Sequence, residues 1–196
     1  MIFIGILERG LLTRAQSQFN GATERAADAI SDRANIYINA LQGGKGLFVA
    51  SETVEREEWK KYVDSLDIQD NYPGIQGIGY AIFVSPDKKD EHIAMIREEG
   101  FPDYTIRPEG VRDIYSTIIY LEPFDIRNQQ AFGYDMFSNS IRRLAMEQAR
   151  DSGEAWLSGR ITLVQEIDND DVQPGFLIYV PHYKNGVPHD TLSERL

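Results

Sequence analysis

Asp135 is the residue of this sequence whose type and surroundings best suit ligand chemistry. It follows the short apolar run Phe132-Gly133-Tyr134, and four tyrosines lie in segments with strand-like patterns: Tyr80, Tyr115, Tyr120 and Tyr179. A carboxylate among aromatic rings suits a pocket for a small heterocycle or amine, because the rings supply apolar area and the acid fixes the orientation of the ligand. Two other interpretations stay open. In the first, Asp135 caps the turn at Ser138 and Asn139. In the second, the tyrosines are ordinary half-buried core residues.

The residue patterns of common enzyme active sites are missing from the sequence. None of the three histidines, which are His92, His182 and His189, has the spacing of a metal-ligand pair, and there is no cysteine. The position of His92 in a helical segment predicts a surface residue. The acidic segment 168–174 lacks the glycine of an EF-hand loop and is interpreted as a solvated hairpin loop. We therefore expect no catalytic residue, metal or cofactor, with a periplasmic hydrolase that uses Asp135 or another acid as the enzyme alternative.

The charge balance restricts the partners of the chain. Its 20 Lys and Arg residues stand against 31 Asp and Glu residues, which gives a formal net charge of -11. Nucleic-acid binding needs a basic surface, so no nucleic-acid partner is expected. Hydrophobic residues make up 42% of the 196 residues, which is enough to bury a core and argues against wholesale disorder.

A long helix is predicted from Leu11 to about Gln42. Apolar residues follow the alternating spacing of four and three that forms the seam of a coiled coil, beginning Leu12, Ala15, Phe19 and Ala22. We interpret residues 1–42 as a stalk helix that forms a homodimer along this seam. The alternative is a long helix that packs on its own domain. The segment Gly43-Gly44-Lys45-Gly46 is predicted to end the helix.

Residues 43–196 are predicted to form a second domain that mixes helices and short strands. Helices are expected at 54–66, 86–98 and 138–150. Strands are expected at 75–84, 104–106, 114–121, 131–136, 155–157, 161–167 and 176–183. Because several strands lie close together in the sequence and are joined by short turns, the pattern favours an antiparallel sheet with helices packed on one side. The expected fold class is therefore α+β.

Six short motifs occur in a fixed order along the chain. They are Leu47–Ser51, Tyr72–Tyr80, Tyr120–Pro123, Phe132–Met136, Ala149–Gly153 and Tyr179–Tyr183. Each motif is weak alone, but together they resemble the CHASE domain, the extracytoplasmic sensor module of histidine kinases, diguanylate cyclases and adenylyl cyclases. The resemblance covers roughly residues 25–185, which is most of the chain.

The resemblance implies a PAS-like ligand-binding sheet that follows a helix leaving the membrane. By similarity to the plant cytokinin receptors of this family, it implies that Asp135 binds the ligand, that the segment at Leu157 supplies a backbone contact, and that Tyr120 and Tyr179 mark the pocket walls. Bacterial members do not share one ligand, so its identity stays open. With Tyr80 and Tyr115 from the strand pattern, these residues form the predicted site.

The resemblance also implies where the domain stands in a larger protein. The apolar residues 1–7 would be the periplasmic end of a membrane helix, and the domain would continue beyond residue 196 to a second membrane helix and a cytoplasmic output module. We expect a small-molecule sensing domain on the periplasmic or extracellular face of a membrane-bound receptor, without enzyme activity of its own. The alternative is a structural spacer that transmits signals without a ligand.

Overall fold

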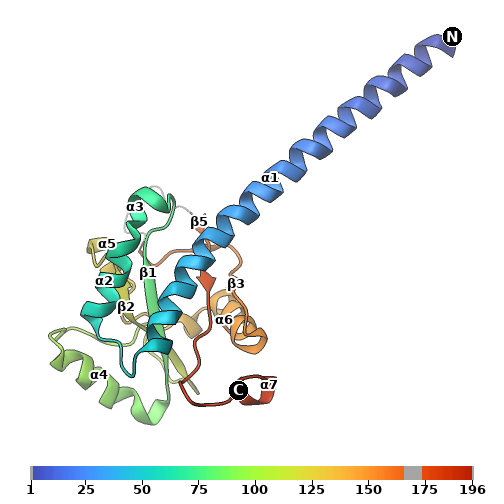
Figure 1. Cartoon of the computed structure of the whole chain (residues 1–196). Helices are drawn as coiled ribbons and strands as arrows, with labels where there is room; N and C mark the ends of the chain where they lie inside the picture. Colours follow the sequence, from blue (N-terminus) through green and yellow to red (C-terminus); the bar gives the residue numbers. More distant parts are fainter. Residues whose placement is uncertain (1, 166–173, 196) are drawn as a thin grey trace. The chain divides into compact units, whose positions relative to one another are not determined.

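The computed structural model describes residues 2–165 and 174–195, and the chain divides into two compact units, Met1–Asn39 and Ala40–Leu196. Helix α1, Ile2–Ala50, forms the first unit and continues into the second (Figure 1). Within the described ranges, no helix combines the length and the apolar character of a membrane span. The predicted hairpin loop at 168–174 lies outside the described residues except for Pro174.

The predicted end of the helix at Gly43 to Gly46 is wrong, because α1 runs through these residues to Ala50. Tertiary packing explains why two of these residues, Gly43 and Gly44, are glycines. A Cβ atom on Gly43 would lie 2.6 Å from the Tyr62 hydroxyl, and one on Gly44 would lie 3.1 Å from the Trp59 ring. Each glycine costs the helix about 1 kcal/mol relative to alanine, but it allows the next helix to approach closely.

The second unit contains short helices and strands in the following order. They are α2 Arg56–Leu66, α3 Ile68–Asn71, β1 Ile78–Val84, η1 Pro86–Lys88, α4 Lys89–Glu98, β2 Tyr115–Glu122, α5 Ile126–Gln129, η2 Met136–Ser138, α6 Ser140–Ser152, β3 Trp156–Leu157, β4 Ile161–Thr162, β5 Pro174–Gly175, β6 Ile178–Tyr179 and α7 Leu192–Arg195. The α+β fold class is confirmed, and so are the helices predicted at 54–66, 86–98 and 138–150.

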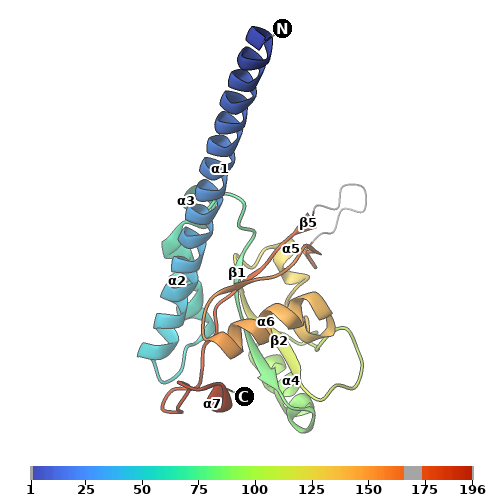
Figure 2. The same ribbon diagram turned by 90° about the vertical axis from the view of Figure 1, so that its right-hand side faces the viewer.

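The strands pair antiparallel in three two-stranded sheets. β1 pairs with β2 (Figure 2), β3 with β6, and β4 with β5. The register of β1 and β2 shifts between Tyr80 and Ala81, where Ile119 of β2 has no partner, so this pair carries a β-bulge. The bulge leaves Tyr80 directly opposite Tyr120.

The strands predicted at 104–106 and 131–136 are not formed, because these segments meet as two loops with isolated bridges. Arg107 bridges Tyr134, and Thr117 of β2 bridges Asp135. Gly133, with a φ of 81°, turns the second loop, and a side chain there would collide with the Thr105 carbonyl. The close contact of the two loops thus replaces a regular ladder.

Helices flank both faces of β2, rather than the one side expected from the sequence. Ile119 belongs to a buried cluster with Ile96 of α4. On the other face, the Ser116 hydroxyl lies 4.0 Å from the sulfur of Met146 on α6. A third cluster around Trp59 joins α2 to β1 and to the last residues of α1. The surroundings of β2 therefore determine where a ligand could bind.

Candidate functional site

Asp135 is completely buried at the beginning of η2. Its Oδ1 accepts hydrogen bonds from the backbone N–H groups of Ser116, at 2.8 Å, and Phe137, at 3.0 Å. The first bond ties the carboxylate to β2, and the second caps η2. Asp135 therefore has the capping role that the sequence pattern left open, and its role in ligand binding stays a prediction.

The second carboxylate oxygen of Asp135 faces Arg112. The Nε atom of Arg112 lies 3.2 Å from Oδ2, which is an ion-pair distance, although the two atoms are not aligned for a hydrogen bond. Tyr115 belongs to the same group, because its hydroxyl donates to the Gly110 carbonyl at 2.8 Å and accepts from the Arg112 backbone N–H at 3.3 Å. A ligand would have to displace Arg112 to reach this carboxylate.

Tyr80 and Tyr120 lie in the aromatic cluster around Trp59. Their rings stack with centroids 6.2 Å apart, and Phe48 of α1 stacks on Tyr80 at 3.9 Å. The Tyr120 hydroxyl donates to the Val54 carbonyl at 2.8 Å. Burial raises the pKa of both tyrosines, so their hydroxyls stay protonated. Tyr80 thus connects α1 to the sheet, and Tyr120 connects the segment between α1 and α2 to it.

A histidine also meets this aromatic cluster. The Nδ1 atom of His182 lies 3.2 Å from the Tyr80 hydroxyl, and its Nε2 is buried without a hydrogen-bond partner. Burial is the main cause that lowers the pKa of His182 below its usual value. His182 is therefore a neutral hydrogen-bonding residue beside Tyr80 at neutral pH.

Leu157 and Tyr179 occupy the short ribbon that follows α6. Leu157 is 43% exposed and lines a shallow surface hollow of about 530 Å³ with Ser158, Arg160, Pro174, Gly175 and Phe176. The Tyr179 hydroxyl is buried without a hydrogen-bond partner, and burial raises its pKa. The two predicted residues thus differ, because one is at the surface and the other points a polar atom into the core.

Arg142 is a buried residue that the search for site residues in the sequence missed. It lies on α6, whose N-terminus is capped by the Asn139 side chain, and the guanidinium sits 4.8 Å from the centroid of the Tyr134 ring. A signal was present in the sequence. Positions 142, 145 and 149 have the spacing of one helix face, and the other two are the buried residues Ala145 and Ala149.

A buried polar chain crosses the core on the α4 side of β2. His92 Nε2 lies 2.9 Å from the Tyr104 hydroxyl, which lies 2.9 Å from Thr117 Oγ1. The prediction of a surface position for His92 is wrong, since the residue is 6% exposed and shares the buried face of α4 with Ile96. Burial lowers the pKa of His92 and raises that of Tyr104 to about 12.

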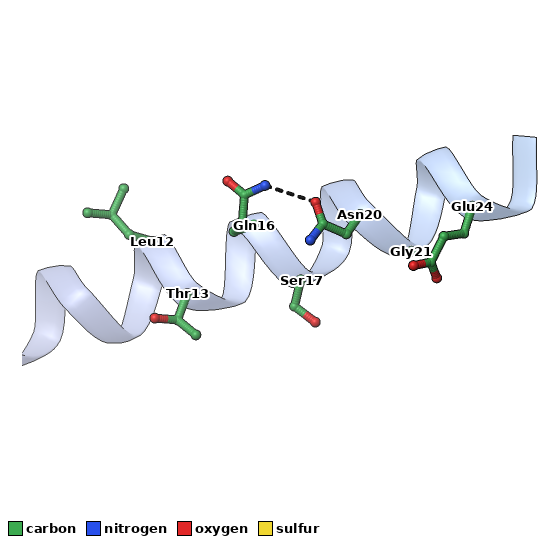
Figure 3. Close-up of a pocket in the computed structure, with 7 residues that line it drawn as sticks. All are labelled: Leu12, Thr13, Gln16, Ser17, Asn20, Gly21 and Glu24. Carbon is green, nitrogen blue, oxygen red and sulfur yellow. Dashed lines mark hydrogen bonds between the residues drawn. The ribbon is translucent and has the colours of Figure 1, made fainter. Parts of the chain in front are cut away.

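A second hollow follows α1 alone. It has a volume of about 730 Å³ and is lined by Leu12, Thr13, Gln16, Ser17, Asn20, Gly21 and Glu24 (Figure 3). Gln16 donates a hydrogen bond to Asn20 at 2.9 Å across one turn. Since one helix supplies every lining residue, this feature is a groove on a helix surface and encloses no ligand. Across the described part of the chain, no three His, Asp or Glu side chains are grouped to hold a metal ion.

Comparison with known proteins identifies the family. The family model of the CHASE domain matches residues 52–196 of the sequence, which is well over half of the chain. No curated protein shows a significant match to the chain. The matched region includes the pair of strands β1 and β2, the buried Asp135 and the ribbon that carries Tyr179. The chain therefore belongs to the CHASE family, whose members are extracytoplasmic sensor domains of signalling receptors.

Proposed function

We propose that this CHASE domain binds a small molecule between α6 and the face of β2 that α6 covers, and that it passes the bound state through α1 to a cytoplasmic histidine kinase or nucleotide cyclase. The full-length receptor would hold the domain on the periplasmic or extracellular face of the membrane. The domain itself is not an enzyme in this proposal.

The observation that carries the proposal is the stack of Phe48 on Tyr80, with ring centroids 3.9 Å apart. It joins the end of α1 to β1. The Tyr62 hydroxyl also donates to the Ala40 carbonyl, so α2 is attached to the same part of α1. A displacement of β1 would therefore reach residues 40–50 through packed aromatic side chains rather than through a flexible linker.

β2 supplies the connection between the proposed ligand face and this stack. Its first half contacts Asp135 through the Ser116 backbone, and its second half carries Tyr120 opposite Tyr80. The guanidinium of Arg56 donates to the Ile119 carbonyl at 2.6 Å and so holds the bulge between these halves. A ligand that shifts the first half of the strand would act on the bulge and on the tyrosine pair.

A structural spacer without a ligand is the second candidate function. The observation that favours it is the environment of Asp135, whose oxygens already face protein donors from Ser116, Phe137 and Arg112. A spacer needs no open pocket, and a buried carboxylate that is held by two backbone N–H groups and an ion pair suits a rigid body.

A screen of small metabolites by thermal shift on the 196-residue chain tests the sensing function. A compound that binds only the folded state raises stability by about 2.7 kcal/mol at a hundred times its Kd. Hydrogen exchange with the best compound then measures residues 40–50, where we expect slower exchange on binding. A Phe48→Ala variant should still bind but lose this response. Saturating binding with unchanged exchange at 40–50 would contradict transmission through α1, and a screen without any stabilising compound would favour the spacer.

The stalk part of the proposal is a homodimer along α1. The side chains of Leu12 and Phe19 on the predicted seam are 69% and 66% exposed in the single chain. We expect weak association, because one apolar stripe gives a modest gain against the entropy of association. Phe19→Glu should abolish the dimer in sedimentation experiments and leave the second unit folded. An equally dimeric variant would contradict the interface.

A further inference from the structure

Arg142 is a buried charged residue whose hydrogen-bonding needs are poorly met by the protein. It is 3% exposed. Nη2 donates to the Thr162 carbonyl at 2.9 Å, whereas Nη1 has the thioether sulfur of Met136, a weak acceptor, at 3.8 Å. Nε has no hydrogen-bond partner. Among the residues that the structure describes, no carboxylate pairs with this guanidinium.

The Tyr179 hydroxyl is a second unpartnered polar group near the guanidinium. Tyr179 and Tyr134 pack against the same buried cluster, and Arg142 lies over the Tyr134 ring. The hydroxyl is buried without a partner. The guanidinium is close enough to oppose the effect of burial on the pKa of Tyr179. Buried donors from α6 and β6 thus lie in one region, where the Thr162 carbonyl is the one oxygen of the described residues that accepts from the guanidinium.

We propose that Arg142 and Tyr179 form the anchor of the ligand site and that the ligand carries a carboxylate. The inference rests on the proposed sensing function and adds the chemical class of the ligand. A carboxylate presents two oxygens that match the planar fork of a guanidinium, and it also accepts from a hydroxyl. Its negative charge compensates the buried cation, which a bound water molecule does not do.

The surrounding side chains indicate what else the ligand contains. Val164, Leu177 and Met146 pack against the same cluster as Tyr179. An apolar group next to the carboxylate would therefore contact these side chains. The flexible side chains of Met136 and Met146 can adjust their rotamers to such a group. The ligand class is a small aromatic or aliphatic carboxylate.

Because the whole chain is negatively charged, anion binding at this site must come from the groups that line it. A net charge of -11 repels anions from the protein as a whole. Binding of a carboxylate would therefore depend on one buried cation rather than on a general electrostatic attraction, and removal of that cation should lower the affinity strongly.

The test uses the 196-residue chain with benzoate, phenylacetate and hexanoate, each paired with its neutral amide. We expect at least one carboxylate to raise the melting temperature and its amide to have no effect. By calorimetry, Arg142→Met should lower the affinity for that carboxylate about ten- to a hundred-fold, and Tyr179→Phe should lower it about three- to ten-fold. Arg143→Met is the matched control, because Arg143 is the exposed neighbour on α6 that pairs with Glu147. It should leave the affinity unchanged.

Several outcomes would overturn the anchor. One is that none of the carboxylates raises the melting temperature, and another is that Arg142→Met binds the carboxylate as well as the parent does. If Arg142→Met fails to fold, Arg142→Lys keeps the charge but loses the planar fork, and unchanged affinity in this variant would also overturn the inference. A neutral or cationic ligand whose affinity ignores Arg142→Met would leave the sensing function standing and remove the carboxylate anchor.

Discussion

Asp135 and Arg142 are both buried charged residues, one at the beginning of η2 and the other on α6, but among the described residues only Asp135 has a partner of opposite charge. Asp135 accepts two backbone hydrogen bonds and faces a guanidinium at 3.2 Å. Arg142 makes one good hydrogen bond and leaves Nε unpartnered. Both are the kind of group that costs several kcal/mol to bury unless it is paired.

A structural charge and a binding charge in this domain differ in the partners that the protein gives them. The carboxylate that fixes η2 to β2 has its charge paired within the protein, although its Oδ2 accepts no hydrogen bond. A charge that serves a ligand must keep donors free for it. On this criterion, Asp135, the residue that the family resemblance favours, fixes η2 to β2, and Arg142 is the residue that we propose to anchor the ligand.

The largest effect on stability is expected for Asp135→Ala. The change leaves the Ser116 and Phe137 N–H groups without their acceptor and Arg112 without its partner. We expect the free energy of unfolding to fall by about 3 kcal/mol, measured by urea denaturation. Asp135→Asn keeps an acceptor oxygen and should lose less, about 1–2 kcal/mol. Equal losses in the two variants would show that the charge, and not the cap, dominates.

A smaller loss is expected for Arg112→Met. This removes the partner of Asp135 Oδ2, but the Arg112 side chain is 22% exposed, so solvent partly compensates the ion pair. We expect a decrease of about 1–2 kcal/mol in the free energy of unfolding. Arg143→Met breaks the exposed pair with Glu147 and serves as the control, with an expected change below about 0.5 kcal/mol. A similar loss of stability in both variants would mean that the ion pair with Asp135 contributes no more than the exposed pair of Arg143 with Glu147.

His92 is a third buried ionisable group, and unlike Asp135 and Arg142 it is kept neutral by the protein. Its pKa is lowered from 6.5, first by burial, with a smaller opposing effect from Glu99, and its ring nitrogen meets Tyr104. As the pH falls, His92 takes up a proton near pH 6.5 in the unfolded chain, and only at a lower pH in the folded protein. Stability should therefore be fully present above about pH 6.5 and fall as the pH decreases below it.

Urea denaturation between pH 5 and pH 8 checks this dependence. His182 contributes in the same direction, since burial also lowers its pKa. The contribution of His92 is therefore the difference between the parent and a His92→Gln variant, which should lose stability less steeply as the pH falls. If the stability of the parent and that of the His92→Gln variant fall equally steeply with pH, a buried neutral His92 is contradicted.

The smallest effect is expected for Arg142→Met in the absence of ligand. The variant removes one hydrogen bond to Thr162, but it also removes a buried charge that pairs with no carboxylate in the described part of the chain. Replacing such a charge by an apolar side chain of similar length is often neutral or stabilising. We expect the free energy of unfolding to change by less than about 1 kcal/mol or to increase. A loss as large as that of Asp135→Ala would make Arg142 a structural charge and end the contrast between the two residues.

Local sequence patterns predicted the elements that local chemistry can form. The apolar spacing of α1, the apolar face of α2 with Trp59 and Val63, and the β-branched and aromatic runs of β1 and β2 all appear where they were predicted. Residue type and periodicity are sufficient for these elements, although the stripe of α1 is exposed at Leu12 and Phe19 and β2 is buried on both faces. The family resemblance likewise depended on short local motifs.

Contacts between distant segments decided the rest. Residues 43–46 continue α1, and the rings of Tyr62 and Trp59 occupy the space beside Gly43 and Gly44, which no local pattern reveals. The segments at 104–106 and 131–136 form loops because they bridge each other and β2. Residue type at one position likewise does not reveal whether a buried charge has partners. Asp135 and Arg142 look equally polar in the sequence, and the different donors and acceptors around them are assembled only when β2, η2 and α6 pack together.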